Sequence, residues 1–123
     1  MNAENEKLVN DFCEAWSRRD VDEILSYLAE DCFYHNIPMR PSVGHAQIRK
    51  FIEPFLKGAQ SANFEIVNTA SSGHVVMNER VDYFTMGDKN LALPVMGVFE
   101  IRDGKIAAWR DYFDMATMNQ QMA

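Results

Sequence analysis

The sequence predicts an α+β fold, in which N-terminal helices pack on the concave face of a curved, mixed or antiparallel sheet and form a cone-shaped pocket. Two observations predict it: helical periodicity is confined to the first half of the chain, and period-two alternation interrupted by turn residues fills the second half. The length of 123 residues suits one domain, spanning residues 1–123, with a single core. Ligand sites favour a concavity of this kind.

The first half of the chain carries three helical segments. Over Glu4–Arg18, apolar residues recur at three- and four-residue steps, namely Leu8, Val9, Phe12, Cys13 and Trp16. Asp20 is placed to cap a second helix, because Glu23 follows at the third position as in a capping box. A third helix is expected from Gly44. Pro54 should kink or end it, because proline lacks the amide hydrogen that an interior helical residue donates.

The other segments are typical of strands. A short strand is expected over Cys32–Ile37, ending at Pro38. Four further strands are expected after Ser61, over Asn63–Thr69, His74–Phe84, Leu91–Ile101 and Lys105–Phe113. Glycine-containing turns separate these four, so consecutive strands should pair antiparallel. The tail Met115–Ala123 should be a short helix or a frayed end.

Composition narrows the classes of partner. The formal net charge of −6, with 12 Lys and Arg spread along the chain, gives no basic patch, so nucleic acid and membrane surfaces are not expected partners. No apolar run reaches the length of a signal segment or membrane span, and a cytoplasmic protein is expected. The two cysteines lie outside any paired motif, so no disulfide is expected. The three histidines lack metal-ligand spacing, and no metal or organic cofactor is expected.

Strand alternation places charged side chains on the face that should be the core. Arg80 and Asp82 share one face of their strand, and Asp111 lies between two large aromatics on the core side of the last strand. A guanidinium can hold two carboxylates at once, and two acids around one arginine should share a proton near neutral pH. That arrangement yields one acid and one base. A buried structural salt bridge, or solvent-facing charges if the sheet faces are reversed, fits the same pattern.

Tyr34 and Asn36 share a face of the strand Cys32–Ile37, next to a proline-containing loop. A phenol and an amide at a strand end can hold a water molecule, because one accepts from it while the other fixes its position. Ordinary strand-end hydrogen bonding is the alternative interpretation.

Three blocks of sequence occur in a characteristic order between residues 34 and 114. They are Tyr34-His35-Asn36-Ile37-Pro38, Asn78-Glu79-Arg80-Val81-Asp82, and Gly97-Val98-Phe99 running through Gly104-Lys105-Ile106 to Trp109-Arg110-Asp111-Tyr112-Phe113-Asp114. Together they resemble the limonene-1,2-epoxide hydrolase family. That family lies in the nuclear-transport-factor-two-like, or SnoaL-like, superfamily, which also holds ketosteroid isomerases and polyketide cyclases.

The resemblance implies a cofactor-independent, one-step addition of water to an epoxide, giving a vicinal diol from limonene-1,2-epoxide or a related cyclic or terpenoid epoxide. Asp111, with Tyr34 and Asn36, would bind and deprotonate the water. Asp82 would enter protonated and donate to the epoxide oxygen, while Arg80 bridges the two carboxylates.

Two other functions keep the same fold. One is a ketosteroid-isomerase-like or polyketide-cyclase-like enzyme, in which one acid moves a proton from carbon; the other is a non-catalytic small-molecule-binding domain. By strand parity, the walls of the pocket should include Phe84, Leu93, Val95, Gly97 and Phe113. The apolar outer face of the sheet predicts a homodimer; it carries Val75, Met77, Val81, Tyr83 and Tyr112.

Overall fold

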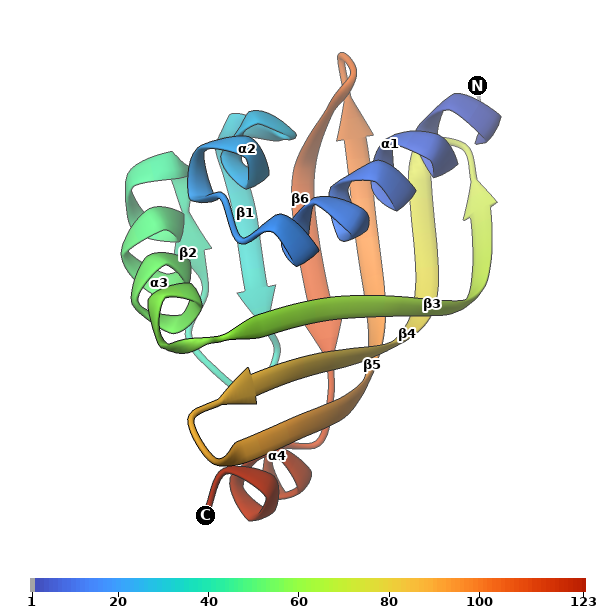
Figure 1. The fold of residues 1–123 in the computed structure, drawn as a ribbon. Coiled ribbons are helices and arrows are strands. Elements are labelled where there is room, and N and C mark those ends of the chain that lie inside the picture. Colours follow the sequence, from blue (N-terminus) through green and yellow to red (C-terminus); the bar gives the residue numbers. More distant parts are fainter. Residues whose placement is uncertain (1) are drawn as a thin grey trace.

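The computed structural model describes residues 2–123. Figure 1 shows helices lying across one face of a strongly curved sheet, which confirms the predicted α+β architecture. Along the chain, the helices are α1 (Asn2–Ala15), the short 3-10 helix η1 (Trp16–Arg18), α2 (Val21–Ser26), α3 (Gly44–Gly58) and α4 (Met115–Met122). The strands are β1 (Leu28–Asn36), β2 (Ser42–Val43), β3 (Ser61–Ser72), β4 (Val75–Met86), β5 (Lys89–Arg102) and β6 (Lys105–Tyr112).

The helical segments follow the sequence pattern, with two differences. The predicted first helix is divided, because α1 gives way to η1 and Arg19 then adopts a left-handed conformation with φ of 54°. Asp20 caps α2 as predicted, accepting a hydrogen bond from the backbone amide of Glu23. The helix α3 continues past Pro54 to Gly58, so Pro54 does not end it, and the predicted alternative of a kink stays a prediction. Pro54 lies on the exposed side of the helix.

The six strands form one mixed sheet in the order β2-β1-β6-β5-β4-β3. All neighbouring strands pair antiparallel except β1 and β6, which run parallel. β1 begins at Leu28, four residues before the predicted strand, and its pairing with β6 is irregular between Leu28 and Phe33. That irregularity interrupts the alternation on which the prediction depended. The parallel pair matters for function, because it sets the end of β1 beside the end of β6.

The core lies between the helices and the concave face of the sheet. Phe12 on α1 is fully buried and packs edge-to-face on Trp109 of β6, with ring centroids 4.8 Å apart. Trp16 on η1 stacks on Phe64 of β3 at 4.9 Å. Aromatic contacts of this kind add to the free energy gained from burying apolar surface. None of the helices within residues 2–123 is long and apolar enough to cross a membrane.

Candidate active site

A single guanidinium group organises the buried polar residues. Arg80 on β4 is 1% exposed, and each of its N–H groups donates a hydrogen bond. Nε and Nη2 donate to the two carboxylate oxygens of Asp82, both at 2.9 Å. Nη1 and Nη2 donate to Asp111 at 3.1 and 2.8 Å, and Nη1 also donates to Asn78 Oδ1 at 3.1 Å. The predicted bridge of one arginine between two acids is therefore the geometry observed, with every donor of the fork in use.

Strand register explains why these side chains meet. Asn78, Gly97 and Asp111 are direct neighbours across β4, β5 and β6, and Asn36 on β1 continues the same row. Gly97 is required in the middle of this row. A Cβ atom there would lie 2.4 Å from Arg80 Nη1 and 3.0 Å from Asp111 Oδ1, so the missing side chain leaves the space that the guanidinium occupies.

Asn36 is paired with Asp111 in the strand register, and Tyr34 lies on the same strand, β1. Asn36 Nδ2 donates to the phenol oxygen of Tyr34 at 2.8 Å. Tyr34 stacks on Trp109 with ring centroids 4.2 Å apart, and Trp109 Nε1 donates to Asp111 Oδ1 at 2.8 Å. Because the Tyr34 hydroxyl accepts from Asn36, its own proton is free to point toward a third group. Burial raises the pKa of Tyr34, so this phenol stays protonated.

Burial and neighbouring charges shift the pKa values of Asp82 and Arg80. Burial raises the pKa of Asp82 to about 6, even though Arg80 lowers it, and the negative charge of Asp111 raises it further. Burial alone would lower the pKa of Arg80, but Asp111 and Asp82 more than offset this and its pKa lies well above the ordinary value. Arg80 is therefore a fixed cation, and Asp82 holds a proton at higher pH than an ordinary aspartate does.

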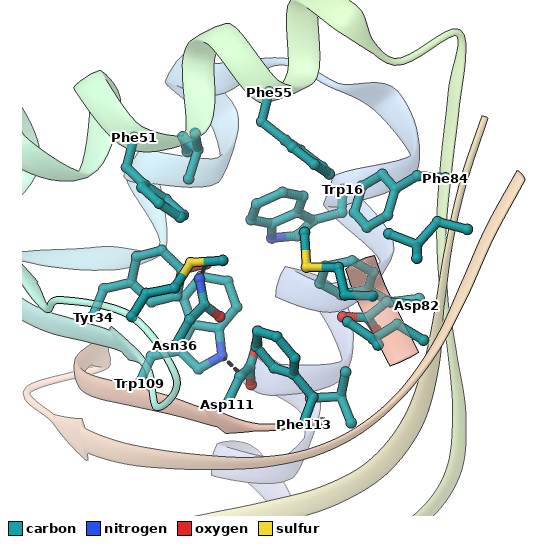
Figure 2. A pocket seen from close by; sticks show the side chains of 17 residues that line it. Trp16, Tyr34, Asn36, Phe51, Phe55, Asp82, Phe84, Trp109, Asp111 and Phe113 are labelled. Atoms are coloured by element: carbon teal, nitrogen blue, oxygen red, sulfur yellow. Dashed lines mark hydrogen bonds between the residues drawn. The ribbon is translucent and has the colours of Figure 1, made fainter. Parts of the chain in front are cut away.

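A cavity that is partly open to solvent lies above this network. Figure 2 shows Asp82 and Asp111 on its sheet side, with Phe51 and Phe55 of α3 opposite. The predicted wall residues Phe84, Leu93, Val95 and Phe113 all line it. Gly97 was also expected in the wall, but it lies beneath Arg80 instead. The lining that sequence reasoning did not assign to the pocket comprises Trp16, Met39, Phe51, Ile52, Phe55, Phe64, Leu91, Trp109 and Met118.

Some of these missed residues carried a usable signal. Phe51 and Phe55 fall on the apolar stripe of α3, and Trp109 precedes Asp111 by two residues and so shares its face. Trp16 closes the apolar stripe of the first helix. Met118 carried no such signal in the sequence, because α4 shows no strong amphipathic pattern.

The remaining buried reactive groups have structural roles. Asn78 Nδ2 donates to the sulfur of Cys13 at 3.6 Å, behind the arginine. Burial raises the pKa of the Cys13 and Cys32 thiols to about 12, so both stay protonated. Both cysteines are buried and free. Among residues 2–123, no group of three or more His, Cys, Asp or Glu side chains is placed to hold a metal ion.

Comparison with known proteins shows the family of the chain. Residues 3–123 match the family model of the limonene-1,2-epoxide hydrolase catalytic domain. The chain is 30% identical over 110 residues to the epoxide hydrolase EphG of Mycobacterium tuberculosis, which covers 89% of this chain and 73% of EphG.

Solved structures share the fold over nearly the whole chain. The structure of an LEH-like epoxide hydrolase from M. tuberculosis has a TM-score of 0.79 and 30% identity, covering 97% of this chain and 89% of that chain. A putative polyketide cyclase from Xanthomonas campestris has a TM-score of 0.87 at 22% identity, covering 98% of each chain, which is a likeness of fold alone. The family match extends over almost every residue of the chain, from the first helix to the last, and the protein therefore belongs to the limonene-1,2-epoxide hydrolase family.

Proposed function

We propose that this protein hydrolyses a cyclic or terpenoid epoxide, such as limonene-1,2-epoxide, to a vicinal diol by direct attack of water. The observation that carries the proposal is the buried pair of acids held by one arginine, Asp82 and Asp111 on Arg80, at the floor of an apolar cavity. Of two neighbouring acids, one that enters ionised and one that enters protonated would supply the base and the acid that ring opening needs.

Asp111 is the proposed base. Its carboxylate is next to Asn36 in the strand register, and Asn36 in turn bonds Tyr34, so a water placed among the three has two groups to orient it. As the water oxygen forms its bond to an epoxide carbon, Asp111 takes the water proton. Trp109 Nε1 and Arg80 hold the carboxylate in place during the transfer. Fixing water and substrate in line can supply on the order of 7–11 kcal/mol in favourable cases.

Asp82 is the proposed acid. Its raised pKa of about 6 keeps a sizeable protonated fraction near neutral pH, and a bound apolar substrate would raise that fraction by removing water. As the carbon–oxygen bond of the epoxide breaks, Asp82 protonates the departing oxygen, which becomes the second hydroxyl group of the diol. Ring strain supplies part of the driving force.

Asp82 must regain a proton, and Asp111 must lose one, after the product is released. One turnover leaves Asp111 protonated and Asp82 ionised, so a proton must pass from one to the other before the next turnover. Arg80 Nη2 bonds both carboxylates, at 2.9 and 2.8 Å, and this contact couples their charges. All steps use side chains of this chain, and the proposed reaction requires no metal or organic cofactor.

The apolar walls support a hydrocarbon-rich substrate. Leu91, Leu93 and Val95 come from the sheet, while Phe51 and Phe55 close the opposite side (Figure 2). An isomerase or cyclase of the same fold would instead move a proton from carbon. Arg80 between the two acids argues against that chemistry, because the oxyanion hole of an isomerase is built from a tyrosine and a neutral acid in apolar surroundings, without an arginine.

The proposal also covers the oligomeric state of the protein and its place in the cell. The outer face of the sheet leaves Val67, Tyr83, Met96 and Tyr112 between 39% and 54% exposed, and we propose that it forms a homodimer interface. Light scattering that gives the mass of one chain would contradict this. A cytoplasmic location fits the two buried free thiols, and cell fractionation tests it.

The test of the reaction is hydrolysis of limonene-1,2-epoxide in oxygen-18 water, followed in a single turnover. Direct attack predicts that the first diol carries the label. Asp111→Asn and Asp82→Asn should each lower kcat by roughly 10²–10⁴-fold. Asp88→Asn, which changes an exposed aspartate in the β4–β5 turn, is the matched control. Turnover that survives both substitutions would reject Asp82 and Asp111 as the acid and the base. Label that first enters a carboxylate of the protein would reject direct attack of water on the epoxide.

A further inference from the structure

Trp16 presents a buried donor that nothing in the protein uses. Within residues 2–123, its Nε1 is the one buried side-chain nitrogen or oxygen without a hydrogen-bond partner, and the residue is 3% exposed. Buried indole N–H groups normally have an acceptor, because leaving such a donor unpaired costs free energy. The other tryptophan follows the rule, since Trp109 Nε1 donates to Asp111.

The unpaired N–H belongs to the pocket. Trp16 lines the cavity, and Figure 2 shows its indole ring at the centre of the pocket with the nitrogen-bearing edge turned toward the interior. The ring is fixed by stacking on Phe64 at 4.9 Å and by an edge contact with Phe84. The nitrogen is closely covered, but the lining also includes Met39 and Met118, whose unbranched side chains can change rotamer to admit a ligand atom.

Trp16 and the acid pair reach the pocket from different layers of the fold. Trp16 comes from η1, in the helical layer, whereas Asp82 and Asp111 come from β4 and β6. A substrate between the layers would offer its epoxide to the acids and another part of its surface to Trp16. The epoxide oxygen already has a donor in protonated Asp82, so ring opening does not call for the indole.

We propose that Trp16 Nε1 donates a hydrogen bond to a second oxygen of the substrate, a hydroxyl or carbonyl group remote from the epoxide. The preferred substrate is then an oxygenated cyclic or terpenoid epoxide rather than a pure hydrocarbon epoxide. That the substrate is an epoxide rests on the proposed function. That the substrate carries a second oxygen rests on the unpaired N–H of Trp16.

The first test observes the donor directly and needs no turnover. The chain contains two tryptophans, so a ¹H–¹⁵N spectrum has two indole signals, which Trp16→Phe assigns. The ligands are α-terpineol, which carries a remote hydroxyl group, and limonene, its hydrocarbon counterpart. The Trp16 indole proton should move downfield with α-terpineol and not with limonene. Equal shifts with both, no shift when α-terpineol is bound, or no binding of α-terpineol would each overturn the proposal.

The second test measures selectivity between two epoxides. The ratio of kcat/KM for the 1,2-epoxide of α-terpineol to that for limonene-1,2-epoxide should fall roughly tenfold in Trp16→Phe, the effect expected of one neutral hydrogen bond. Phe55→Leu trims the same pocket without removing a donor and should change this ratio much less than Trp16→Phe does. A ratio that Trp16→Phe does not alter would overturn the proposal. Failure to hydrolyse any epoxide would instead reject the proposed function, while the spectra would still report on Trp16.

Discussion

The two sides of the pocket are built in opposite ways. The sheet side buries four polar residues, Asn78, Arg80, Asp82 and Asp111, each 5% exposed or less and all joined by hydrogen bonds. The helical side is made of aromatic and methionine side chains, and Phe51 there is 40% exposed. Buried polar networks fix one geometry because each bond depends on the others, whereas apolar walls can repack. The sheet side should therefore set the chemistry, and the helical side the choice of substrate.

The largest expected effect comes from Arg80. Arg80→Met leaves two buried acids without their cation and should lower the free energy of unfolding by about 3–5 kcal/mol. Arg80→Lys keeps the charge but has fewer donors and no planar fork, so it should recover part of the stability while kcat remains at least roughly 100-fold below wild type. Urea unfolding and steady-state kinetics measure the two quantities. A lysine variant with wild-type kcat would show that charge alone suffices.

The second effect is pH dependence through Asp82. Its pKa of about 6 in the folded protein exceeds the ordinary value of 3.8, so the folded state binds this proton more tightly than the unfolded state. The stability that this proton contributes is complete below about pH 4 and is lost as pH rises through about 6, a fall of at most roughly 3 kcal/mol. Because the acid must be protonated, kcat/KM should also fall tenfold per pH unit above about 6.

Asp82→Asn provides the control for the stability measurement. The variant cannot titrate at this position, so the loss of stability between pH 4 and pH 6 should be smaller than in the wild type. Urea unfolding at a series of pH values measures it. An unchanged pH dependence in the variant would assign the titration to another group.

The third effect tests how closely the network fits the sheet. Gly97→Ala would place a methyl group 2.4 Å from Arg80 Nη1, and the guanidinium cannot swing away without breaking its hydrogen bonds. We expect a loss of about 1–3 kcal/mol in the free energy of unfolding, with lower kcat. Gly58→Ala is the matched control, because its Cβ would meet the flexible end of Met86 at 3.3 Å. Equal stability of the two variants would show that the network tolerates displacement.

The same contrast explains what the sequence could predict. Alternation within β4 and β6 placed Arg80, Asp82 and Asp111 on the core face, because side-chain parity is a local property of a strand. The meeting of Asn78, Gly97 and Asp111 depends on register between strands, which no local pattern encodes. The resemblance to a family supplied the residue roles that parity could not.

The helical side was predicted less well for physical reasons. The helix α3 extends beyond Pro54 with Leu56 buried in the core, and such tertiary packing is not reported by helix propensity. Met118 reaches the pocket because of how α4 docks on the sheet. No residue of α4 is buried, so its sequence lacks the apolar stripe that would predict this docking. The unpaired N–H of Trp16 follows from ring orientation, which an apolar stripe does not encode.

The smallest effect concerns how α4 is held against the sheet. β5 pairs with β6 only from Met96 onward, so the edge of its first half is free on that side, and Gln121 bonds it there. The Gln121 side chain accepts from the backbone amide of Ala92 at 2.6 Å and donates to its carbonyl at 3.0 Å, as a neighbouring strand would. This contact holds the helix that carries Met118 into the pocket wall (Figure 1).

Gln121→Ala should therefore loosen the wall and leave the network of Arg80 intact. We expect a loss of about 1 kcal/mol in the free energy of unfolding and a several-fold rise in KM, with kcat changing less. Gln120→Ala, the same substitution at an exposed neighbour on α4, should change neither. Steady-state kinetics on limonene-1,2-epoxide separates the two parameters. A fall in kcat with constant KM would mean that α4 acts on the chemistry itself, and the division between the two sides of the pocket would not hold.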